Sequence, residues 1–120
     1  MAEERDVKDD EHPEIVAWRR RIDLIDTQIM GLLNSRSACA VEIGRIKRVL
    51  GLPIYSPERE AAILERVMRE NPGPLDPTAI RRVFERMIDE GRRLERLAAE
   101  DVPRESPQRP QGVSETKQKG

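Results

Sequence analysis

A long apolar stripe in the first half of the chain constrains the fold more than any other feature. Its positions recur at alternating steps of three and four, the spacing of a helix-packing seam. They are Ile15, Trp18, Ile22, Ile25, Ile29, Leu32, Arg36, Cys39, Ile43, Ile46 and Leu50. The stripe contains no proline, so it predicts one helix over residues 14–50, roughly 50 Å long at 1.5 Å per residue. The residues that follow are too few to cover such a helix, and we expect it to pack on a second copy of the chain.

Composition favours a single, purely helical domain. The chain has 120 residues, of which 37% are apolar and only three are aromatic, so the core is thin and aliphatic. Charged residues make up 38% of the chain but nearly cancel, at a net charge of −1. This balance gives no electrostatic footprint for nucleic acid or an anionic membrane, and we expect neither as a partner.

The same inventory predicts a cytoplasmic protein. No stretch approaches the ~20 apolar residues of a membrane span. Residues 1–10 are charged where a signal peptide would be apolar. The single cysteine, Cys39, has no disulfide partner in the chain, and its place on the stripe predicts a small buried hydrophobe.

Proline and glycine divide the chain into three helices between two tails. Residues 1–13 are expected to form a disordered N-terminal tail, residues 14–100 the helical domain, and residues 101–120 a disordered C-terminal tail. Gly51 and Pro53 end the first helix. Ser56 is expected to cap the second helix, and Asp76 repeats the start signal for the third.

The residue types also limit the chemistry. The only histidine is His12, in the predicted tail, so catalytic triads and histidine-based metal sites are disfavoured, and we expect no metal. The helices instead carry cations and carboxylates on faces expected to be internal, a combination suited to binding a small dianion and stabilising charge that shifts during a reaction. These residues are Arg19, Arg36, Lys47, Arg59, Glu60 and Glu95.

Four segments together resemble the all-helical class of chorismate mutases. They are residues 19–26 (RRRIDLID), residues 32–36 (LLNSR), residues 41–47 (VEIGRIK), and Pro53 with residues 57–60 (PERE). The resemblance covers roughly residues 14–97. It implies an intertwined helical dimer that converts chorismate to prephenate without a cofactor, toward phenylalanine and tyrosine.

Helix geometry limits how the three leading cations can meet. Arg36 and Lys47 are about three turns, or ~16 Å, apart on one helix, so long side chains could converge on a ligand between them. Arg19 lies ~25 Å from Arg36 along the helix, so it can serve the same ligand only from an antiparallel partner.

The resemblance implies a role for each of these residues. Arg36 and the partner subunit's Arg19 would hold the two carboxylates of chorismate. Lys47 would contact a carboxylate and the ether oxygen, where negative charge develops. Glu60 would accept a hydrogen bond from the substrate hydroxyl, and Arg59 would help to position a carboxylate.

Three positions depart from the common family pattern. Glu95 stands where many members have glutamine, and it must be protonated to donate to the ether oxygen. Burial would favour its neutral form and Lys47 its charged form. Gly91 stands about where a serine often contacts the substrate. Ser56 replaces an acidic residue that often contributes through its backbone. Because Glu95 must be protonated to donate, we expect activity to rise as pH falls.

Structural explanations compete with these roles. Arg19 could be a solvated surface side chain, and Arg59 with Glu60 ordinary charge in a first helical turn. Arg36 could form a buried ion pair with Glu42 or Glu65, or could fix the register of an oligomer.

At the third helix, Glu95 could pair with Arg92 or Arg93, and Gly91 could permit close packing. At the level of function, the alternatives are an isochorismate pyruvate lyase on the same fold, or a non-catalytic helical dimer that regulates another shikimate-pathway enzyme.

Overall fold

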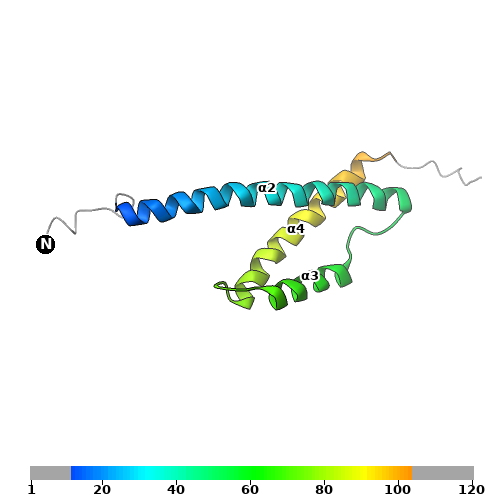
Figure 1. Cartoon of the computed structure of the whole chain (residues 1–120). Helices are drawn as coiled ribbons and strands as arrows, with labels where there is room; N and C mark the ends of the chain where they lie inside the picture. The colour runs from blue at the N-terminus through cyan, green and yellow to red at the C-terminus, as the bar shows by residue number, and fades with distance from the viewer. Residues whose placement is uncertain (1–11, 104–120) are drawn as a thin grey trace, which may run out of the picture. The chain divides into compact units, whose positions relative to one another are not determined.

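The computed structural model describes residues 12–103, which form three helices (Figure 1). Helix α2 spans Pro13–Leu50, α3 spans Pro57–Glu70 and α4 spans Pro77–Asp101. No strand occurs within these described residues, so the predicted all-α class is confirmed. The helices include Pro13 and Asp101, one residue beyond the expected limits at each end. His12, Val102 and Pro103 are described but lie outside the helices, and the remaining residues of both predicted tails lie outside the described residues.

The chain divides into two units, Met1–Arg36 and Ser37–Gly120, and helix α2 contributes to both. In the first unit, α2 is the only element among residues 12–36. From Trp18 to Leu32, the apolar stripe of this unit is exposed among the described residues. Trp18 is 67% exposed and Leu32 is 71% exposed, and the stripe residues between them are exposed as well.

A glycine-based cap ends α2 and sets the position of Lys47. Gly51 has a φ of 72°, in the left-handed region that glycine adopts without strain. The Leu52 amide donates to the Lys47 carbonyl at 2.8 Å, and the Gly51 amide donates to the Arg48 carbonyl at 3.3 Å. These two bonds define a Schellman motif. Lys47 therefore lies in the last turn, where the helix dipole favours a cation.

The two other helices begin at proline, as predicted, but their caps differ. The Asp76 carboxylate accepts from the Ala79 amide at 2.7 Å, which caps α4. Ser56 occupies the same position before α3, but its hydroxyl makes no capping bond. The Ser56 carbonyl accepts the first helical hydrogen bond, from the Glu60 amide at 3.1 Å, as the Asp76 carbonyl does from the Ile80 amide at 3.0 Å. The expectation of a serine side-chain cap was therefore wrong.

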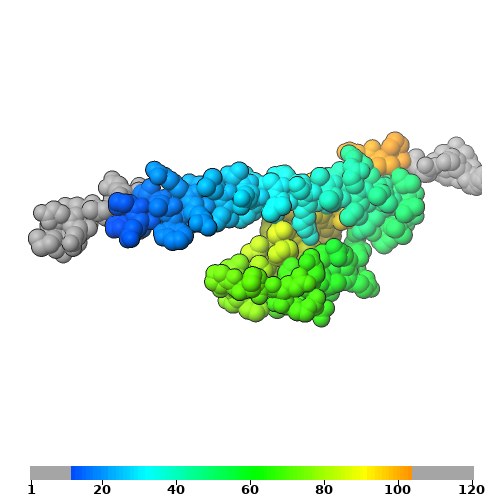
Figure 2. Space-filling view, in the orientation of Figure 1, coloured from blue at the N-terminus to red at the C-terminus, as the bar shows by residue number. Residues whose placement is uncertain are grey.

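Helices α3 and α4 pack against each other around a small aliphatic core. Ile63 and Val67 from α3 and Ile88 from α4 are buried, and Leu64 and Phe84 pack beside them. Figure 2 shows atoms of α3, in green, against those of α4, in yellow. This contact fixes the first turn of α3 next to the middle of α4. The first turn of α3 carries the predicted site residues Arg59 and Glu60.

Small residues allow the end of α2 to approach α4 closely. Ala40 and Gly44 are the buried residues of α2, and Ala98 and Gly91 are buried on α4. Cys39, next to Ala40, is exposed in the chain, so its predicted burial is not found. The close approach therefore uses positions beside the predicted stripe, while Cys39 lies on the uncovered side of the helix.

Candidate active site

Lys47 and Glu95 form an ion pair between the last turn of α2 and the second half of α4. The Lys47 Nζ donates to Glu95 Oε1 at 2.8 Å and to the Ile54 carbonyl at 2.7 Å. Both side chains are largely shielded, at 17% and 18% exposure. Partial burial reduces solvent screening, so each charge acts more strongly here than on an open surface. The two acceptors also fix the direction of the ammonium group.

Gly44 makes this ion pair possible because it brings the backbones of α2 and α4 together. A Cβ atom at position 44 would overlap the Glu95 carbonyl oxygen and would lie 2.7 Å from the Glu95 Cα. Gly44 and Lys47 are three residues apart, so they lie on the same face of α2. The absence of a side chain at Gly44 therefore places Glu95 within reach of Lys47.

A second cluster joins α3 to α4 through Arg92. Its Nε donates to Glu60 Oε2 at 2.8 Å, and its Nη2 donates to Glu60 Oε1 at 3.1 Å. Nη2 also donates to Asp89 Oδ1 at 2.9 Å. The guanidinium carbon lies 5.4 Å from the centre of the Tyr55 ring, within the range of a cation–π contact.

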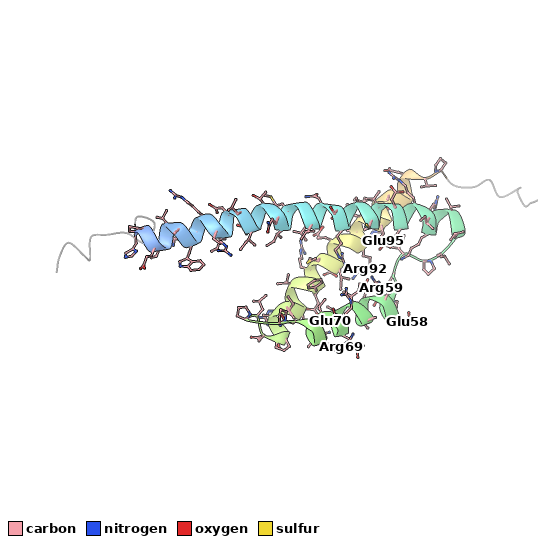
Figure 3. The ribbon with its side chains drawn as sticks, in the orientation of Figure 1. Glu58, Arg59, Arg69, Glu70, Arg92 and Glu95 are labelled. Atoms are coloured by element: carbon pink, nitrogen blue, oxygen red, sulfur yellow. The ribbon has the colours of Figure 1, made fainter. Side chains whose placement is uncertain are left out.

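These contacts keep Arg92 charged and hold it in place. The hydrogen bond to Glu60 is the largest influence and raises the pKa of Arg92 above its ordinary value, although burial opposes the rise. Arg92 and Glu95 are three residues apart on α4, so the two clusters share one face of that helix (Figure 3).

Arg92 was not among the predicted site residues. A signal was present, because Asp89, Arg92 and Glu95 repeat at steps of three along the helix. The alternative pairing of Glu95 with Arg92 or Arg93 is not found. Arg92 binds Glu60, and the Arg93 Nε lies 3.5 Å from Glu90 Oε1.

The remaining predicted residues are placed as follows. Ser56 is half-buried before α3, Arg59 is exposed in the first turn of α3, and Gly91 is buried on α4. Arg19 and Arg36 belong to the first unit, where Arg19 is exposed and Arg36 is half-buried. Of the eight predicted residues, the structure brings Lys47 and Glu95 into direct contact, while Glu60 is held by Arg92.

Residues 12–103 lack the features of two other kinds of site. No group of three or more histidine, cysteine, aspartate or glutamate side chains in that range is arranged to hold a metal ion. No helix in the same range combines the length and the apolar composition needed to cross a membrane. What the described residues do offer is charge of both signs, arranged at the junction of three helical segments.

Comparison with known proteins identifies the class to which this helical arrangement belongs. Residues 18–96 match the family described as chorismate mutase type II, and this range contains all eight predicted site residues. The chain belongs to the chorismate mutase type II family. It is 31% identical over 85 residues to a chorismate mutase of Methanocaldococcus jannaschii, covering 70% of this chain and 86% of that protein.

Solved structures show the same fold. The chorismate mutase of Thermus thermophilus (form II) has 38% identity and a TM-score of 0.67, with 68% of this chain and 93% of that chain covered. The chorismate mutase of Helicobacter pylori in complex with prephenate has 25% identity and a TM-score of 0.70, with coverages of 77% and 100%.

Some relatives are much longer than the matched region. The bifunctional chorismate mutase/prephenate dehydratase of Pseudomonas aeruginosa is 38% identical over 80 residues, which cover 62% of this chain. The match spans only 22% of that relative. The chain therefore matches only about a fifth of the length of that relative.

Proposed function

We propose that this protein is a chorismate mutase, an isomerase that converts chorismate to prephenate in the biosynthesis of phenylalanine and tyrosine. The observation that carries the proposal is the shielded pair of Lys47 and Glu95, in a chain of the chorismate mutase type II family. The structure of the H. pylori relative, which is in complex with prephenate, is matched over its whole length.

The reaction needs charge stabilisation rather than a nucleophile or a cofactor. One carbon–oxygen bond of the ether breaks as one carbon–carbon bond forms within the same molecule, so no atom enters or leaves. The ether oxygen gains negative charge in the transition state, and a preorganised cation stabilises this state more than the substrate. Lys47 is such a cation, because the Ile54 carbonyl and Glu95 fix its ammonium group. Protonated Glu95 would donate a second hydrogen bond to the same oxygen.

The remaining predicted residues would bind the substrate. Arg36 and the partner subunit's Arg19 would hold the two carboxylates. This binding selects the compact conformer, in which the reacting carbons approach each other. Glu60 would accept a hydrogen bond from the substrate hydroxyl. Arg59 would position a carboxylate, while Ser56 and Gly91 would line the site through their backbones.

The site in this proposal requires a homodimer. Support comes from the apolar stripe of α2, where Trp18 and Leu32 are among the most exposed apolar side chains in the described chain. Contiguous apolar surface of this kind is unusual on a monomer and typical of an interface. An antiparallel partner helix would cover the stripe and would carry its Arg19 toward Arg36.

Mixing two inactive variants tests both the dimer and the origin of Arg19. We expect Arg19→Ala and Arg36→Ala each to lose activity. If Arg19 acts across the dimer, a heterodimer contains one site with both substitutions and one intact site. Unfolding and refolding an equal mixture should then restore about a quarter of wild-type activity, because half of the dimers are mixed and each has one working site.

Several outcomes would contradict this part of the proposal. No recovery on mixing would mean that both arginines act within one chain. A purely monomeric protein in sedimentation at micromolar concentration would exclude the shared site. Each variant refolded alone serves as the control for recovery without subunit exchange.

Product analysis tests the reaction itself. We expect purified protein to consume chorismate, seen as a loss of its absorbance, with prephenate as the separated product, and we expect Lys47→Ala to abolish the conversion. Release of pyruvate from isochorismate, without prephenate formation from chorismate, would instead identify an isochorismate pyruvate lyase on the same fold.

The bifunctional relatives favour a second proposal, namely association with another shikimate-pathway enzyme. If the chain is a partner-dependent module, its turnover should be low alone and should rise when that enzyme is added. Equal turnover with and without the added enzyme would contradict activation by a partner.

We also propose a cytoplasmic location for the protein. The single cysteine, Cys39, has a free thiol, which supports this location.

A further inference from the structure

We propose that Arg92 is a positioning residue that orients Glu60 toward the substrate hydroxyl. This inference rests on the proposed function. In the described hydrogen bonds, Arg92 contacts neither Lys47 nor Glu95. The inference comes from the geometry of the cluster that joins α3 to α4. Arg92 acts through Glu60 and not on the reacting atoms.

The contact between the two side chains leaves Glu60 little freedom. Two parallel hydrogen bonds, at 2.8 Å and 3.1 Å, match the planar guanidinium to both carboxylate oxygens. A free glutamate has three rotatable side-chain bonds and loses substantial entropy when it is fixed. Because Arg92 fixes it before substrate binds, Glu60 retains one lone pair on each oxygen with a defined direction.

Arg92 is itself held from two further sides. Asp89, one turn earlier on α4, accepts from the same Nη2 atom at 2.9 Å. The Tyr55 ring, in the segment between α2 and α3, lies 5.4 Å from the guanidinium carbon. Arg92 is 29% exposed and Glu60 is 21% exposed, so the pair is shielded more than the surface ion pairs of these helices. The cluster therefore ties the linker, α3 and α4 to one guanidinium.

The charge of the cluster argues against Arg92 as a cation for the substrate. One positive charge faces two carboxylates, those of Glu60 and Asp89, so the cluster carries no excess positive charge with which to attract a dianion. Lys47, Arg36 and Arg19 would supply the cations for the substrate under the proposed function. The chemistry left to Arg92 is to hold an acceptor in place.

A double-mutant cycle on kcat/KM tests this role. Arg92→Met removes the guanidinium and retains much of its volume, and Glu60→Ala removes the acceptor. We expect each single variant to lose roughly 10- to 100-fold in kcat/KM, since small displacements of a positioning group can cost about 10²-fold. The double variant should lose no more than Glu60→Ala alone, because Arg92 has nothing to position once Glu60 is gone.

Two further variants separate positioning from general stability. Arg92→Lys can still bind one carboxylate oxygen and should recover part of the activity lost in Arg92→Met. Arg93→Met alters the adjacent, exposed arginine and should keep wild-type kcat/KM. Far-ultraviolet circular dichroism and thermal unfolding establish that each variant is folded. If Arg92→Met does not fold, Arg92→Lys in the presence and absence of Glu60→Ala provides the same cycle.

The outcomes distinguish this inference from the proposed function. Loss on Arg92→Met that persists in full in the Glu60→Ala background would overturn the positioning role, because Arg92 would then act independently of Glu60. Unchanged activity in Glu60→Ala would overturn it as well. A wild-type protein that neither binds nor converts chorismate would remove the proposed function and this inference together, whereas wild-type turnover with an additive cycle removes the inference alone.

Discussion

Replacing Glu95 with glutamine tests the chemistry of the site most directly. In the structure, Glu95 accepts a hydrogen bond from Lys47 at 2.8 Å, so its charged form partly neutralises the cation that the reaction needs. An ionised carboxylate also cannot donate to the ether oxygen, whereas a protonated carboxyl group or a glutamine amide can. We therefore expect the wild-type activity to rise as pH falls, and the activity of Glu95→Gln to vary little.

The size of the effect follows from one proton and one hydrogen-bond donor. As pH rises, kcat should fall by up to about tenfold per pH unit, because the proposed mechanism requires one protonated group. The fall should level off at about 10²–10³-fold, the typical worth of one preorganised donor to a developing oxyanion. Glu95→Gln should consequently exceed the wild type at high pH, and the difference should narrow as pH falls.

The surroundings of Glu95 support a specific effect of this substitution. Lys47 also donates to the Ile54 carbonyl at 2.7 Å, and the glutamine oxygen can still accept from Lys47, so the ammonium group keeps its partners. Arg92, one turn earlier on α4, is held by Glu60 and Asp89. The free energy of unfolding should therefore change by less than about 2 kcal/mol.

The assay is the initial rate of chorismate loss in a buffer series of constant ionic strength, with the product separated at each pH. Glu90→Gln is the matched control, because it makes the same change on α4 at a residue that pairs with Arg86 and Arg93. That control should keep the wild-type profile. Identical profiles for wild type and Glu95→Gln would refute protonated Glu95 as the donor, as would a uniform loss at every pH.

Three further substitutions, two of them with a control variant, test the packing and capping that position the site. Gly44→Ala should lower the stability by about 1–2 kcal/mol and reduce kcat, because the new methyl group overlaps the Glu95 backbone. Gly31→Ala, where the new methyl group meets no atom within 4 Å beyond its chain neighbours and its own helix backbone in the described residues, should be neutral or stabilising, and equal thermal shifts for the two variants would contradict this reasoning. Ile63→Ala in the core between α3 and α4 should cost about 2–5 kcal/mol in chemical denaturation, and a loss below about 1 kcal/mol would mean that this core contributes little. Asp76→Ala should cost about 1 kcal/mol by the same measurement through loss of the α4 cap, whereas Asp76→Asn should retain most of the stability.

Much of the fold could be predicted because its determinants are local. The three- and four-residue period of apolar side chains predicted three helices, and proline or glycine predicted where each begins and ends. Gly51 and Asp76 form the expected end and start signals with observed hydrogen bonds. Ser56 fails as a side-chain cap although its residue type favours one, because the backbone conformation before α3 decides where its hydroxyl lies.

The site was predictable only in part. Resemblance to the family selected Lys47 and Glu95, and the structure brings them into contact. It did not select Arg92, because the pairing with Glu60 joins residues 32 positions apart and depends on how α3 packs on α4. The family pattern also gave no reason to expect that the Gly44 backbone would lie close to the Glu95 backbone.

For this protein, the sequence by itself determined the helices, their limits and the residue types available for chemistry, since helix formation and capping depend on neighbours within a few residues. The tertiary structure alone decided which charges pair, since an ion pair between helices requires side-chain atoms to meet within about 3 Å. That condition depends on the small residues at helix contacts and on the packing of α3 against α4, which place Lys47 beside Glu95 and Arg92 beside Glu60.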